Sequence, residues 1–158
     1  MSRWPMVKLG EVCSIEKGKI GIKAATPGRF PLVTTGEGLS SHIEAHFCGE
    51  GVCIPLVSAT GHGHASIKRI PYIAGEFSVG SILCVCLVKQ SNKLSGRYLH
   101  YYLTKNKDSL LVPLMQGSAN ISLKVDDIEN VAIPLPPLAE QQATVAQLDA
   151  LEDKIQQV

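Results

Sequence analysis

Residues 128–151 read IENVAIPLPPLAEQQATVAQLDAL, and this stretch determines how the rest of the chain is interpreted. The short apolar run that ends at Ile133 is typical of a strand. Prolines at positions 134, 136 and 137 then predict an extended segment, because proline fixes φ and lacks an N–H. A helix is predicted over residues 138–158, with Glu140 in the first turn, where the helix dipole favours an acidic side chain.

The predicted helix carries a line of apolar residues. From Leu148 onward their spacing is 3, 4 and 3 residues, which is the heptad pattern of a helix that pairs with another helix. The residues expected to pair are Val145, Leu148, Leu151, Ile155 and Val158. So short a seam makes a weak coiled coil by itself. Two expectations stay open: the chain is a fragment, or it is a half-length subunit that must dimerise.

The stretch that begins at Pro134 resembles the end of a target-recognition domain in the DNA specificity subunits of type I restriction–modification enzymes. In that family Pro-Leu-Pro-Pro-Leu, followed by Glu-Gln, leads into a long conserved helix. The start of the chain is similar as well, since Trp4 precedes Lys-Leu-Gly-Glu-Val at residues 8–12. Matches at both ends extend the resemblance over essentially the whole chain, although the middle is not diagnostic.

The resemblance implies an α+β fold. Residues 1–137 would form a target-recognition domain with a mixed, mainly antiparallel β-sheet and a few short helices. Residues 138–158 would begin the long, coiled-coil-forming spacer and dimerisation helix. The expected function is recognition of one half of a bipartite target in double-stranded DNA.

The resemblance also implies partners. A methyltransferase subunit, which binds S-adenosylmethionine itself, would dock on the helical region and connect the chain to a motor and nuclease subunit. The helix would pair with that of a second recognition domain or of a second copy. Two alternatives remain: a protein-interaction or regulatory domain without DNA specificity, and the recognition domain of a single-chain restriction–methylation enzyme.

Composition and charge agree with a DNA-binding domain. The chain has 158 residues, of which 45% are hydrophobic, so it suits one domain with a core. It contains no run of 18 apolar residues and no signal peptide, so a cytoplasmic location away from membranes is expected. Residues 1–125 hold 14 Lys/Arg and 7 Asp/Glu (+7), whereas residues 126–158 hold 1 and 7 (−6), which sum to +1. This asymmetry suggests a polyanionic partner for the body and a protein partner for the tail, unless the charges are simply scattered.

No catalytic motif is apparent. The prolines at 136 and 137 lie between leucines and do not form an amino-methyltransferase motif, and the chain has neither GxSxG nor a phosphate-binding loop. We therefore expect a non-catalytic subunit without cofactor or metal. The five cysteines are expected to be reduced and buried. A zinc site from Cys48, Cys53, His62 and His64 is the one metal alternative, but its spacing matches no standard site.

Candidate DNA contacts come from basic and polar residues in predicted strands and loops. Alternation over residues 15–23 predicts a strand or hairpin with a basic outer face. Residues 58–66 (SATGHGHAS) are expected to form a glycine-rich loop, and residues 67–73 a strand that carries a Lys-Arg pair. The family resemblance adds the polar residues after Val33 and in the loop at 116–124. The candidates are Lys17, Lys19, Lys23, Thr34, Thr35, His62, His64, Lys68, Arg69, Asn120 and Lys124.

Further elements follow from local signals. A short helix or turn is expected over residues 7–14, and a glycine turn at 49–51 before a buried strand at 52–57. The apolar run at 81–88 predicts a central strand covered on both faces. Ser95 is a natural N-cap for a helix whose tyrosines, at 98 and 102, are expected to pack in the core. A short acidic turn or helix is expected at 126–129.

Overall fold

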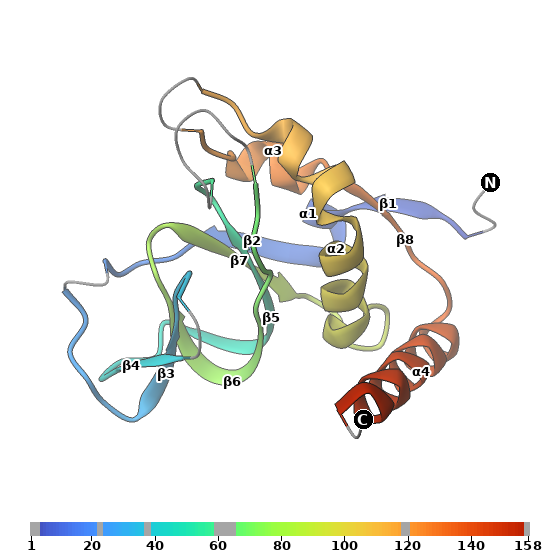
Figure 1. Ribbon diagram of the computed structural model, residues 1–158, viewed down its shortest axis with the longest axis horizontal. Helices are drawn as coiled ribbons and strands as arrows, with labels where there is room; N and C mark the ends of the chain where they lie inside the picture. The colour runs from blue at the N-terminus through green and yellow to red at the C-terminus, as the bar shows by residue number, and fades with distance from the viewer. Residues whose placement is uncertain (1–3, 22–23, 37–38, 59–65, 118–120, 157–158) are drawn as a thin grey trace.

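The computed structural model describes residues 4–21, 24–36, 39–58, 66–117 and 121–156, with backbone only for residues 153–156. Six strands form one sheet in the order β2-β7-β5-β6-β3-β4, and β1 pairs with β8 separately (Figure 1). The strands are β1 (Met6–Lys8), β2 (Cys13–Lys17), β3 (Phe30–Val33), β4 (Ser40–His42), β5 (Phe47–Pro55), β6 (Tyr72–Val79), β7 (Leu83–Val88) and β8 (Ala132–Pro134). The helices are α1 (Leu9–Val12), α2 (Gly96–Leu110), η2 (Val112–Leu114), α3 (Val125–Glu129) and α4 (Leu138–Gln156).

The six-stranded sheet is curled and buried on both faces at its centre. In β7, Cys84 and Cys86 face the cluster that includes the helices, while Leu83 and Val85 face a second cluster around Phe77. The expectation of a central strand covered on both faces is therefore confirmed. Pairing is antiparallel except between β3 and β6, which agrees with the predicted mixed, mainly antiparallel sheet.

The curl brings the chain after β2 against the end of β6. Ile20 forms a parallel bridge with Gly80, and the amide of Gly18 donates to the Leu83 carbonyl at 2.8 Å. A side chain at Gly18 would overlap the carbonyl oxygen of Gly80, so only glycine allows this close approach.

Three strand predictions were wrong in their boundaries. β5 runs through Gly49 and Gly51, which were expected to form a turn. Gly49 has a φ of 126° and lies opposite Gly75, with a φ of 101°, so these glycines bend a strand pair instead of ending it. The strand expected at 67–73 starts only at Tyr72, because Pro71 has no N–H for the ladder. β2 ends at Lys17, well before residue 23.

The first residues form more than the expected short helix. Only residues 9–12 are helical, as α1, while Val7 lies in β1. β1 pairs with β8 in the register Met6↔Pro134 to Lys8↔Ala132. The strand expected before the proline segment is therefore confirmed, although it runs through Pro134, and its partner comes from the opposite end of the sequence.

The helix α2 forms as its sequence predicts. Ser95 is the N-cap, and its hydroxyl accepts from the Tyr98 amide at 3.2 Å. Tyr98 is buried, donates to the Pro134 carbonyl at 3.2 Å and stacks on Tyr102. The core role expected for both tyrosines is confirmed, as is the short acidic helix, which is α3.

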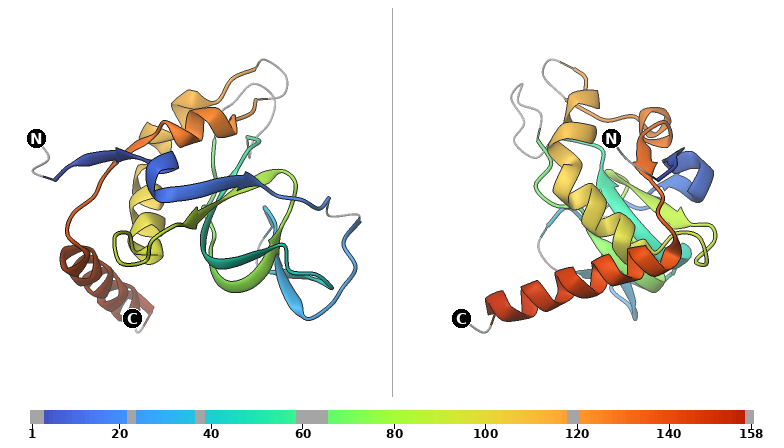
Figure 2. Two further views of the ribbon diagram at one scale, coloured as in Figure 1. Left: turned by 180° about the vertical axis from the view of Figure 1, so that it is seen from behind. Right: turned by 90° about the vertical axis from the view of Figure 1, so that its right-hand side faces the viewer.

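The helix α4 leaves the proline segment and extends away from the sheet (Figure 2). Gln141, in its first turn, is completely buried and uses its whole side-chain amide. Its oxygen accepts from the Ser95 amide at 2.8 Å, and its nitrogen donates to the carbonyls of Lys93 at 2.9 Å and Pro136 at 2.8 Å. One side chain thus joins α4, the proline segment and the start of α2.

A second contact fixes α4 two turns further on. Arg97 of α2 donates to Asp149 of α4 at 2.6 Å, and the hydroxyl of Tyr101 also donates to Asp149. The pair is about 40% exposed on both sides, so it directs the helix more than it stabilises it. Whether α4 pairs as a coiled coil stays a prediction. Within the described residues, no helix is long and apolar enough to cross a membrane.

The anchor at Gln141 can be tested against its neighbour Gln142, which is exposed. Gln141→Ala leaves buried amide and carbonyl groups without partners, so we expect the free energy of unfolding to fall by about 1–3 kcal/mol. Gln142→Ala should change it by less than about 0.5 kcal/mol. Urea unfolding followed by circular dichroism measures both, and equal effects of the two substitutions would contradict the anchoring role.

Candidate nucleic-acid interface

Two of the predicted contact pairs converge where strands end. Thr34 and Thr35 directly follow β3, and Lys68 and Arg69 lie in the irregular segment before β6. All four line one open pocket of about 220 Å³. Its other lining residues are Pro55, Val57, Ser58, Pro71 and Leu83.

The pocket wall consists of backbone held by hydrogen bonds. The Cys53 amide donates to the Pro71 carbonyl at 2.8 Å, which places the segment with Lys68 and Arg69 beside β5. The Gly80 amide donates to the Val33 carbonyl at 2.9 Å, which fixes the chain just before Thr34. The two pairs therefore approach the pocket from separately fixed segments, as a preformed binding site requires.

The side chains at the pocket differ in exposure and chemistry. Thr34 is buried and its hydroxyl accepts from the Gly36 amide at 3.2 Å, whereas Thr35 is exposed. Lys68 is exposed and Arg69 is half-buried. Hydroxyls beside two cations suit a ligand with both negative charge and hydrogen-bonding edges, as a nucleic acid has.

A third segment, residues 121–123, is hydrogen-bonded to the chain just after β5. The Leu123 amide donates to the Leu56 carbonyl at 2.8 Å, and the Ser58 amide donates to the Ile121 carbonyl at 3.0 Å. Lys124 follows this segment and is exposed, although it does not line the pocket. Its predicted role stays a prediction.

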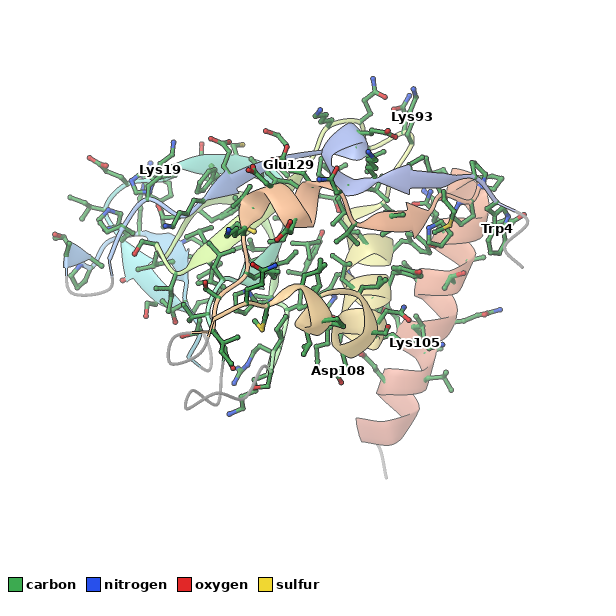
Figure 3. The ribbon with its side chains drawn as sticks, turned by 90° about the horizontal axis from the view of Figure 1, so that it is seen from above. Trp4, Lys19, Lys93, Lys105, Asp108 and Glu129 are labelled. Carbon is green, nitrogen blue, oxygen red and sulfur yellow. The ribbon has the colours of Figure 1, made fainter. Side chains whose placement is uncertain are left out.

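The other predicted contacts are not gathered at the pocket. Lys17 and Lys19 are exposed but outside the lining, and the Lys19 ammonium lies 5.2 Å from the centre of the Phe47 ring. Lys19 and Trp4 lie at opposite ends of the molecule (Figure 3). The predicted residues that fall outside the described part of the chain are Lys23, His62, His64 and Asn120.

Sequence reasoning missed the remaining pocket residues. Val57 and Ser58 come just after β5 and were assigned to a strand end and a loop, without a role. Pro55, Pro71 and Leu83 carry no polar signal at all. Their common feature is that each lies at or just beyond a strand end, which becomes informative only once the strand order is known.

The chain matches the family model described as the type I restriction modification DNA specificity domain over residues 1–157. It belongs to this family. A type I restriction enzyme specificity subunit of Haemophilus influenzae is 32% identical over 96 residues, covering 61% of this chain and 24% of the relative. The specificity subunit of the type I restriction enzyme MjaVIII of Methanocaldococcus jannaschii is 26% identical over 151 residues, covering 87% of this chain and 33% of the relative.

The fold agrees with this membership. A crystal structure of the type I restriction–modification S subunit of M. genitalium matches with a TM-score of 0.74 at 14% identity, covering 98% of this chain and 40% of that one. This specificity domain therefore spans about a quarter to a third of the two curated relatives and two fifths of the solved subunit.

The apolar seam on α4 of the specificity domain is only partly exposed. Val145 packs against the main core, Leu148 is half-buried, and Leu151 is 54% exposed. The side chain of Ile155 and the whole of Val158 lie outside the described part. The pairing role of the five residues stays a prediction, and Val145 already has a contact within its own domain.

The zinc alternative is not tested, because His62 and His64 lie outside the described residues. Cys53 is buried between β6 and β7, and burial raises the pKa of its thiol, while Cys48 is exposed. Burial also raises the pKa of the Cys13 thiol to about 12. The burial expected for the cysteines is confirmed for Cys13, Cys53, Cys84 and Cys86, and it is wrong for the exposed Cys48.

His100, a residue of α2, contacts the segment around Lys68 and Arg69. The His100 ring lies 5.9 Å from that of Tyr72, and a bond to the Ile70 backbone favours the protonated form of His100. The Tyr72 hydroxyl donates to the Glu50 carboxylate at 2.8 Å. Burial is the larger cause, and this bond the second, of the rise in the pKa of Tyr72 to about 12. Burial lowers the pKa of His100 below its usual 6.5.

Protonation of His100 should destabilise the domain at mildly acidic pH, because burial disfavours the charged ring more than the bond to the Ile70 backbone favours it. Because the folded-state pKa is lowered, the stabilisation is fully present above the unfolded value of 6.5 and is lost as the pH falls through the folded pKa. We expect the free energy of unfolding to decrease from pH 7.5 to 5.5, and His100→Gln to flatten that decrease. Urea unfolding at several pH values measures both, and parallel curves for wild type and variant would show that His100 titrates normally.

Proposed function

We propose that this specificity domain recognises one half of a bipartite target in double-stranded DNA. The observation that carries the proposal is the pocket where Thr34, Thr35, Lys68 and Arg69 meet. The two cations would neutralise phosphates and set the register of the domain on the duplex. The hydroxyls and the exposed apolar Val57 offer hydrogen-bonding and apolar contacts for base edges in a groove.

Charge supports the same reading. The net charge of +7 over residues 1–125 (14 basic and 7 acidic) attracts a polyanion, whereas the −6 over residues 126–158 (1 basic and 7 acidic) keeps the tail away from it. The chain would therefore approach DNA with its sheet and leave α4 for protein contacts. Lys17, Lys19 and Lys124 are exposed and would add phosphate contacts beyond the pocket.

The helix α4 would set the distance to the second half-site. Gln141 and the ion pair between Arg97 and Asp149 fix its direction relative to the pocket, so a partner helix bound to it would place a second recognition domain at a defined spacing. The exposed Leu151 favours such pairing. We further propose that a methyltransferase subunit docks on this helical region and carries the chemistry, with the motor subunit bound through it.

A single exposed lysine provides the test. Lys68→Ala should weaken binding to duplex DNA and lower the slope of log affinity against log salt by about 0.9, the contribution of one phosphate contact. Lys105→Ala, which removes an exposed lysine of α2 outside the pocket, should leave the slope unchanged. Fluorescence anisotropy with a labelled duplex at low and moderate salt measures both variants.

A parallel arm with the methyltransferase subunit separates this proposal from its alternative. Steeply salt-dependent binding that singles out one sequence in the presence of that subunit supports recognition of DNA. A folded domain that binds the subunit but no duplex in either arm would instead be a protein-interaction domain. Equal salt slopes for Lys68→Ala and Lys105→Ala would show that the pocket is not part of the DNA interface.

A further inference from the structure

A cluster of two histidines and a glutamate lies at the corner between β4 and β5. His42, Glu44 and His46 belong to one segment, HIEAH, and each offers one ligand atom within 4.8 Å of the other two. None of these residues lines the Lys68–Arg69 pocket, and their corner lies on the side of the sheet away from α4 (Figure 1). The cluster is therefore a feature separate from the proposed DNA contacts.

The backbone of this segment is fixed at both ends. His42 pairs with Phe30 in the ladder between β3 and β4. At the other end, the buried hydroxyl of Ser78 in β6 donates to the Glu44 carbonyl at 2.6 Å and accepts from the His46 amide at 3.3 Å. The three side chains are thus presented by a corner that is tied to two strands, and not by a free loop.

His46 faces Glu44 through one of its two ring nitrogens. Its Nε2 lies 3.5 Å from the Glu44 carboxylate, while its Nδ1 is buried and has no hydrogen-bond partner among the described residues. Because Nε2 faces the carboxylate, it is the nitrogen that would share an ion with Glu44, and Nδ1 would then carry the ring proton.

His42 has a competing contact of modest strength. The Thr26 amide donates to its Nδ1 at 3.2 Å. A neutral imidazole has one lone pair, so a metal ion at His42 would replace this bond. The bond is long for an N–H donor, and a metal–nitrogen bond in its place is the stronger interaction.

We propose that His42, Glu44 and His46 bind a divalent transition metal ion, for which Zn²⁺ is the best fit. Imidazole nitrogens and a carboxylate oxygen are ligands that Zn²⁺ prefers, and the set contains too few oxygens for Ca²⁺. Glu44 is 68% exposed, so its side chain can close on an ion that enters from solvent, and water completes the fourth position. The ion would hold the β4–β5 corner closed, and this role does not depend on DNA recognition.

The test titrates the full, reduced chain with Zn²⁺ by calorimetry and with Co²⁺ by visible absorption. We expect one ion per chain and no thiolate charge-transfer band, because no cysteine takes part. Loss of a residue that only orients a metal ligand typically lowers metal affinity about 10- to 100-fold. Glu44 and His46 are proposed as ligands themselves, so Glu44→Gln and His46→Gln should each weaken binding by at least about ten-fold. Glu44→Gln changes an exposed side chain and should leave the fold intact.

Matched control variants test whether the ion binds at His42, Glu44 and His46 and not elsewhere. Glu16→Gln alters an exposed glutamate elsewhere in the sheet, and His62→Gln with His64→Gln removes the other closely spaced histidine pair. Both controls should bind Zn²⁺ like wild type, and Zn²⁺ should raise the melting temperature of wild type but not of Glu44→Gln. Absence of saturable binding to wild type overturns the proposal, as does wild-type affinity in the Glu44 and His46 variants.

Discussion

The three hydrogen bonds of the Gln141 side chain are the interaction on which the arrangement of this specificity domain depends. They join the first turn of α4 to the carbonyls of Lys93 and Pro136 and to the amide of Ser95. Ser95 is the N-cap of α2, and Lys93 and Pro136 lie in the connecting segments before α2 and α4, outside any regular ladder. A buried amide that satisfies all three backbone groups at once couples the direction of the helix to the body of the domain.

The sheet contributes a different constraint, which is its curl. Glycines at 18, 49, 51 and 75 let strands approach or bend where a side chain would not fit or would be strained. Because the sheet curls around Phe77, the ends of β3 and β5 and the segment before β6 come together on one side. The candidate interface is therefore a product of strand order and curvature, and no single stretch of sequence encodes it.

The sequence predicted what local rules control. The apolar run of β7, the Ser95 cap and the proline segment before α4 depend on neighbouring residues and were correct. The glycines at 49 and 51 were misjudged, since a turn and a bent strand use the same residue type. The meeting of Thr34 with Lys68, the partner of β1 and the role of Gln141 all depend on pairing between distant segments. The sequence pattern contains no signal for such pairing, so only the structure provides it.

The pairing of β1 with β8 has a consequence for how the domain forms. These strands come from opposite ends of the sequence, and the Leu135 amide also donates to the Pro5 carbonyl at 2.8 Å. Contacts so far apart along the chain are slow to form because a long loop must close first. The proline segment that positions α4 is thus in place only when the domain is complete, so a partly folded chain would not present a correctly aimed helix to a partner.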